Sequence, residues 1–158
     1  MPSAFRLEIS DFLVVMPKLG IYTTLELYKL AFLINQNKWL EFKKTEKNHV
    51  LRFRDVEYAF LLYESFLPYS IQKVYLMGTH SIDDNNAEKS DSFYLEKPTK
   101  LPVTRDKNLP DVLMLFDTNE KEARLHEWIM RLRTLSGVLS VREFVPSNPK
   151  DEINLLID

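Results

Sequence analysis

One segment, residues 24–35, limits the fold of this chain more than any other. Thr23 and Glu26 stand three residues apart, as in a capping box, and predict a helix that begins near Thr24 and ends near Asn35. Projected at about 100° per residue, this helix is polar only on a narrow arc, and apolar side chains fill more than half of its circumference. Such a helix must be covered on two sides, by a sheet and by a further element or a second subunit.

Short apolar runs typical of β-strands supply the sheet. The runs cover residues 4–16, 39–44, 49–66, 71–81, 111–117, 138–145 and 153–157, and the third of them predicts a bend or bulge near Asp55. A second helix is expected after Asp117, with apolar residues on one arc, charged residues on the other and Gly137 as its stop. Helices between strands of this kind favour two layers, with both helices packed on one sheet.

The length of 158 residues fits one domain with a real core, and a hydrophobic content of 45% is that of a globular chain. We therefore expect a single α+β domain over residues 1–158, with a mainly antiparallel sheet of about six strands and two principal helices. Its two strand–helix–strand units are compatible with a ferredoxin-like core with extra strands. Residues 81–108 turn polar and predict a long, mobile loop within the domain.

Composition also limits the setting and the partners. The chain has no cysteine and its first residues do not form a signal peptide, so we expect a cytoplasmic protein. No apolar run approaches the roughly 20 residues that cross a bilayer, so we expect no membrane partner. Lys and Arg number 21 against 23 Asp and Glu, which leaves no positive excess to hold a nucleic acid by counterion release.

Motifs of catalysis are missing from the sequence. Three glycines are too few for a phosphate-binding loop, and His49, His80 and His126 have no partner at a metal-ligand spacing. Thr79, His80, Ser81 and the aspartates at 83–84 are neighbours in sequence, but no elbow motif accompanies them. We therefore expect no catalytic residue, no metal and no cofactor, and favour a protein that is not an enzyme.

Three residues of the first helix are candidate binding residues. Tyr28, Lys29 and Asn35 interrupt its apolar surface, and Tyr28 and Asn35, seven residues apart, share one face. In the simpler interpretation the ring of Tyr28 is buried, Lys29 reaches water and Asn35 caps the end of the helix. In the functional interpretation the three side chains line a groove beside the helix.

Several stretches of the sequence form a familiar pattern. Leu19, Gly20 and Ile21 precede a helix that carries Tyr28, Lys29, Leu30 and Asn35, and "YLMGTHS", "DVLMLFD", "LSVREFV" and "INLLID" follow. This pattern resembles the IPExxxVDY family of small, uncharacterised proteins of Bacteroidota, in which a strand ending in Leu-Gly-Ile leads to a helix with Tyr, Lys, Leu and a later Asn. The chain departs from the family in having Leu-Pro-Asp at 109–111 in place of Ile-Pro-Glu, no Val-Asp-Tyr, and Leu27 at a usually acidic position. The resemblance implies the fold and no activity.

Three hypotheses about function follow. In the first, the protein acts through protein–protein contact as a homodimer, with Tyr28 or Phe32 at the interface and an unidentified protein partner. In the second, it is a small-ligand-binding protein or enzyme with a pocket under the 81–108 loop. In the third, aromatic and basic side chains of the strands bind single-stranded RNA, namely Arg52, Phe53, Arg54, Tyr58 and Phe60.

Overall fold

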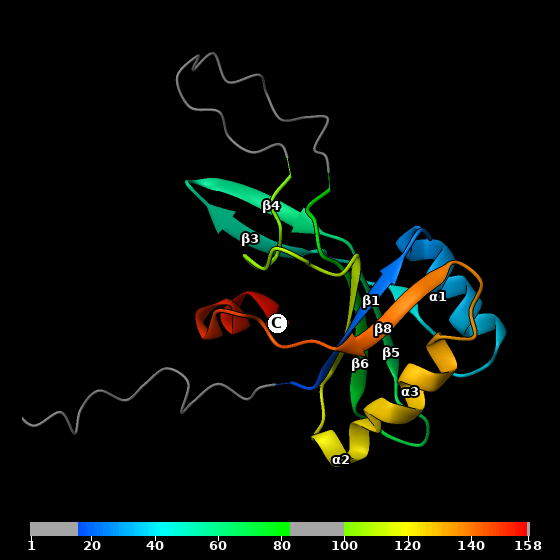
Figure 1. Ribbon diagram of the computed structural model, residues 1–158. Helices are drawn as coiled ribbons and strands as arrows, with labels where there is room; N and C mark the ends of the chain where they lie inside the picture. The colour runs from blue at the N-terminus through cyan, green and yellow to red at the C-terminus, as the bar shows by residue number, and fades with distance from the viewer. Residues whose placement is uncertain (1–15, 83–99, 158) are drawn as a thin grey trace, which may run out of the picture.

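Six antiparallel strands form the central sheet of the computed structural model, which describes residues 16–82 and 100–157 (Figure 1). In spatial order the strands are β2 (Lys43–Lys44), β5 (Leu62–Phe66), β6 (Lys73–Gly78), β7 (Val112–Phe116), β1 (Lys18–Thr23) and β8 (Val138–Glu143). A separate antiparallel hairpin consists of β3 (His49–Phe53) and β4 (Val56–Phe60). The α+β class, the six-stranded antiparallel sheet and the two principal helices are as predicted.

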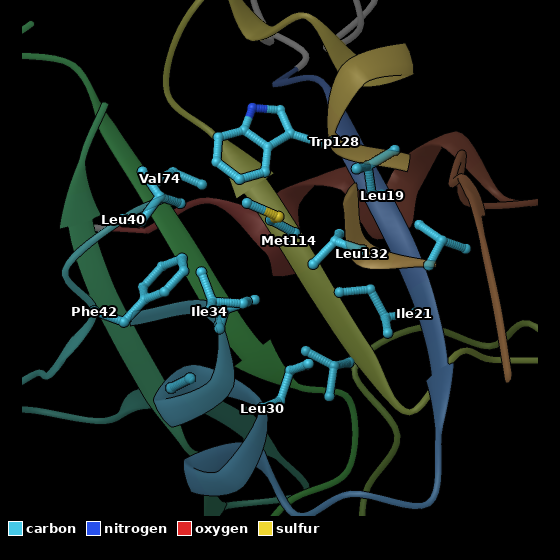
Figure 2. Packing of buried hydrophobic residues seen from close by; sticks show 14 of the residues in the cluster. Leu19, Ile21, Leu30, Ile34, Leu40, Phe42, Val74, Met114, Trp128 and Leu132 are labelled. Carbon is cyan, nitrogen blue, oxygen red and sulfur yellow. The ribbon is translucent and has the colours of Figure 1, made fainter. Parts of the chain in front are cut away.

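One face of the sheet is covered by α1 (Leu27–Gln36) and α3 (Leu125–Leu132), as Figure 1 shows. Leu30 and Ile34 of α1 and Leu132 of α3 are fully buried over the sheet, and Trp128 lies at the opposite end of the cluster from Leu30, near Met114 (Figure 2). The core under the helices draws on the sheet residues whose side chains point to this face, namely Leu19, Ile21, Val74, Leu76, Val112, Met114, Phe116 and Val141. This layer explains the apolar stripe on each helix.

The other face of the sheet is covered too. The β3–β4 hairpin, the segment around Val103 and the 3₁₀-helix η3 (Pro149–Leu155) pack on the alternate side chains of the same strands. All five residues of β7 are buried, with Leu113 and Leu115 in this second core. A strand covered on both faces has no polar side, which is why its sequence does not alternate.

The predicted start of the first helix is wrong by three residues. Glu26 is extended, with φ −67° and ψ 152°, and α1 begins at Leu27. The hydroxyl of Thr23 donates to the carbonyl of Gly137 at 2.7 Å and accepts from the amide of Leu25 at 3.0 Å. It therefore holds the turn before the helix to the α3–β8 connection and does not close a capping box.

The predicted second helix is two helices. α2 (Glu120–Ala123) and α3 are separated by Arg124, whose φ of 51° is left-handed. α3 ends at Leu132, and Gly137, with φ 95°, belongs to the turn into β8 and not to the helix end. Backbone hydrogen bonds hold the chain between α3 and β8: Thr134 N donates to Arg131 O, and Leu135 N donates to Leu132 O.

Three strand predictions differ from the structure. The run at 153–157 lies largely within η3, where the side chain of Asn148 accepts from the amide of Lys150 at 3.0 Å and starts the turn. The run at 49–66 is three strands, because Arg54 and Asp55 both have positive φ and turn β3 back on β4. The run at 39–44 forms only the two-residue strand β2.

Two predictions lie outside the described residues, namely the strand at residues 4–15 and the mobility of the loop at 83–99. The full extent of the domain and the ferredoxin-like repeat stay predictions. The described ends of the loop are joined by backbone hydrogen bonds, from Ser81 N to Leu101 O at 2.9 Å and from Val103 N to Thr79 O at 2.8 Å.

Within residues 16–82 and 100–157, no helix is long and apolar enough to cross a membrane.

Candidate contact surface on helix α1

The exposed side of α1 carries two aromatic rings. Tyr28 is 53% exposed and Phe32 is 62% exposed, while Leu30 and Ile34 of the same helix are fully buried. Positions i and i+4 of a helix are neighbours on its surface, so the two rings form one apolar patch. The structure thus covers the apolar circumference of α1 on the sheet side and leaves this patch in water.

Lys29 lies beside the patch. Its ammonium is 5.8 Å from the centre of the Tyr28 ring, within the range of a weak cation–π contact at an exposed site. The structure brings these two predicted residues together at the surface, and the exposure of Tyr28 contradicts the interpretation in which its ring is buried.

Asn35 has a different place from the other two predicted residues. Its Nδ2 donates to Phe42 O at 2.9 Å, and its Oδ1 accepts from Phe42 N at 2.7 Å. The end of the helix is instead capped by Asn37, whose Nδ2 donates to Leu33 O at 2.8 Å. Asn35 therefore fastens the returning segment to α1, and its polar atoms are used within the fold.

A polar cluster on the second face joins η3 to the sheet. The ammonium of Lys18, nearly fully buried, lies 2.8 Å from Glu152 Oε2 and donates to Met16 O at 2.7 Å. Asp151, also buried, accepts from the guanidinium of Arg105 at 3.0 Å. Among the described residues no buried side-chain polar atom lacks a partner, and no group of acidic and histidine side chains fits a metal ion. The cluster is built to hold the chain together.

Asp106 fastens the same part of the chain. Its carboxylate accepts from the Thr104 hydroxyl at 2.7 Å, from the Ser147 amide at 2.9 Å and from the Ser147 hydroxyl. Partial burial raises the pKa of this carboxyl, but the hydrogen bonds from Ser147 and Thr104 outweigh it and lower the pKa below its ordinary value. Asp106 is thus a charged anchor between two loops.

The sequence neighbours Thr79, His80 and Ser81 are not arranged for nucleophilic catalysis. The Thr79 hydroxyl is buried and donates to Pro110 O at 2.5 Å, and the Ser81 hydroxyl accepts from Leu101 N at 2.8 Å. His80 Nδ1 lies 3.2 Å from the Thr79 hydroxyl, which already has its backbone partner. Asp83 and Asp84 lie outside the described residues.

The residues considered for RNA stacking are divided between surface and core. Tyr58 and Phe60 of β4 are buried in the second core, while Arg52, Phe53 and Arg54 are exposed near the tip of the β3–β4 hairpin. Buried rings have no face to offer a base. The alternation along β4 therefore reflects the core.

Two surface hollows lie on either side of the turn between β5 and β6. One has a volume of about 310 Å³ and includes Trp39 and Phe66 in its lining; the other, of about 630 Å³, includes Tyr69 and Trp128. Neither is lined by His80 or Tyr28. Sequence reasoning missed this region, because Pro68 and Ser70 are typical of a turn but do not indicate the hollows beside it.

No family model matches the chain, and no curated protein and no solved structure matches it. Membership of the IPExxxVDY family therefore stays a prediction, and the assignment of function depends on the surface described above.

Proposed function

We propose that this is a non-enzymatic cytoplasmic protein that acts through protein–protein contact as a homodimer, with Tyr28 and Phe32 of each α1 at the centre of the interface. The observation that carries the proposal is the exposure of both rings on one helix face. Aromatic side chains are enriched at interfaces, where a large apolar ring gains most from leaving water.

The two rings supply part, about a quarter, of the ~1,600 Å² that a stable dimer interface buries. An aromatic side chain can bury about 150–250 Å², so each half-exposed ring has roughly 100 Å² left to bury. Four such rings in a symmetric pair would remove about 400 Å² from water, about 10 kcal/mol at ~25 cal/mol per Å². Association costs about 4–15 kcal/mol, so the rings offset much of this cost and neighbouring contacts set the affinity.

Native mass spectrometry and sedimentation velocity test the proposal. We expect the unaltered chain to be a dimer and Phe32→Asp to weaken it at least about a hundredfold, because the carboxylate would replace an apolar contact in both copies. Met130→Asp is the matched control, since Met130 is also apolar and is 55% exposed, but lies on α3. The proposal fails if the unaltered chain is a monomer, or if Phe32→Asp dimerises as tightly as Met130→Asp.

The same mass spectrum distinguishes the ligand-binding hypothesis from the contact proposal. A small molecule retained at one copy per chain would favour the ligand-binding alternative, and its mass would identify the class of ligand. A dimer of unmodified mass would support the contact proposal.

A further inference from the structure

The larger hollow lies between the β5–β6 turn and the kinked helices α2 and α3, where α2 sits at the lower end of the sheet in Figure 1. Leu67, Ala123 and Trp128 are buried and form its apolar base. We call this region the turn–helix groove; its lining includes, besides these three, Tyr69, Ile71, Arg124, Glu127 and Arg131.

Two bulky apolar side chains stand at the rim of the turn–helix groove. Tyr69 is fully exposed and Ile71 is 91% exposed. The turn that presents them is well braced, since Leu67 N donates to Gln72 O at 2.8 Å and Ser70 Oγ accepts from Gln72 N at 3.0 Å. A rigid turn with exposed apolar side chains is the kind of surface that gains from contact with a partner.

The backbone conformation of two groove residues bears on the choice of variants. Tyr69 and Arg124, on opposite sides of the groove, both have left-handed backbone, with φ of 56° and 51°. Glycine adopts this conformation without strain, whereas a side chain adds a steric cost. Lys38, Arg54 and Asp55 also have positive φ, so the strain does not by itself mark the groove, but Tyr69→Gly would relieve it.

Charge decides which partner fits the turn–helix groove. Two guanidiniums and one carboxylate line it, and the single ion pair, from Arg124 Nη1 to Glu127 Oε2, is long at 3.9 Å and exposed. The guanidinium of Arg131 stacks 5.0 Å from the centre of the Trp128 ring, an arrangement in which the N–H groups at its edge can donate to a carboxylate. An acidic group therefore complements this wall.

We propose that the turn–helix groove binds a short segment of a partner protein in which carboxylates stand next to a large apolar side chain. The apolar side chain lies between Tyr69 and Trp128, and the carboxylates pair with Arg124 and Arg131. A peptide segment fits better than a small molecule, because the hollow is open and one wall is fully in water, whereas small-molecule sites enclose their ligand. The proposal does not depend on dimerisation through α1.

Random peptides displayed on phage and selected on the full chain provide the test. We expect selected peptides to combine Asp or Glu with Phe, Trp or Leu, and their affinity, measured by fluorescence anisotropy, to fall at least about tenfold with Arg131→Glu. Tyr69→Gly should also weaken binding at least about fivefold without lowering the unfolding midpoint, because glycine relieves the left-handed strain while removing the ring.

The chain offers a matched control for each variant. Arg52→Glu reverses the charge of another exposed arginine, as Arg131→Glu does, and Arg54→Gly relieves another left-handed residue at an exposed turn. Both should leave peptide binding unchanged. The proposal is overturned if selection gives no shared acidic and apolar motif, or if the controls weaken binding as much as the groove variants. It is also overturned if Arg131→Glu and Tyr69→Gly dissociate a dimer in sedimentation velocity, which would make a second copy the occupant.

Discussion

Replacing Lys18 with methionine tests how η3 is held to the sheet. The side chain of Lys18 is 2% exposed and that of Glu152 is 12% exposed, so the variant Lys18→Met leaves a carboxylate buried without its counter-charge. Methionine fills a similar volume, so packing changes little and the loss comes from the ion pair. The carbonyl of Met16 also loses its donor.

The expected loss is large for one side chain. Removing one partner of a buried ion pair costs about 3–5 kcal/mol, and the slight exposure of Glu152 puts this case near ~3 kcal/mol. A domain of this size has about 5–15 kcal/mol in all, so the variant should lose a fifth or more of its stability. The unfolding midpoint should fall by roughly 6–12 °C.

Urea unfolding followed by tryptophan fluorescence measures the effect. The double variant Lys18→Met with Glu152→Leu should recover most of the stability, because an apolar pair no longer leaves a charge unpaired. The control is Lys73→Met, which breaks the half-exposed pair with Glu64 at 3.3 Å and should cost about 1 kcal/mol or less. A cost below about 1 kcal/mol for Lys18→Met, or a double variant less stable than the single one, would refute the reasoning.

Three further predictions concern single side chains. Asn35→Ala removes both hydrogen bonds to the segment after α1 and should lower the free energy of unfolding by about 1–3 kcal/mol in urea; a loss under about 0.5 kcal/mol would contradict its role. Gly20→Ala places a methyl group onto the ring of Pro110 and should cost about 1–3 kcal/mol by thermal unfolding, whereas Gly78→Ala, with its nearest neighbour at 3.9 Å, should not cause a clash. Because the pKa of Asp106 is lower in the folded state than its ordinary 3.8, the carboxylate adds to the free energy of unfolding above that pH, and this contribution is lost as the pH falls below it. Asp106→Asn should remove this part of the acid destabilisation. Identical profiles of stability against pH for the two proteins would refute this prediction.

Periodicity in the sequence predicted most strands of the sheet and the positions of the two principal helices, because alternation and the 3.6-residue repeat are local properties. It did not predict β1, because the first apolar run was ended at Pro17. It also did not predict the break at Arg124, since nothing in an arginine signals left-handed backbone. The apolar run at 153–157 was taken as a strand because short apolar runs are ambiguous between strand and helix.

The site was predictable only in part. The surplus of apolar side chains on the first helix predicted a cover on two sides; the sheet provides one, and Phe32 on the other side is 62% exposed, so the second cover stays a prediction. The role of Asn35 depends on a segment that returns to the helix, and the pairing of Lys18 with Glu152 joins residues 134 positions apart. Contacts of this kind leave no trace in a local pattern.

The place of β1 in the sheet has a consequence for synthesis on the ribosome. β1 is among the first described elements to be made, yet its two neighbours, β7 and β8, begin at Val112 and Val138. Until those strands leave the exit tunnel, β1 has no backbone partner on either side, and Lys18 waits longer still for Glu152. Pairings this distant in sequence close slowly, so the nascent chain keeps apolar strand edges exposed for most of its synthesis. A chain of this topology buries β1, its first described strand, only after β7 and β8 have left the ribosome.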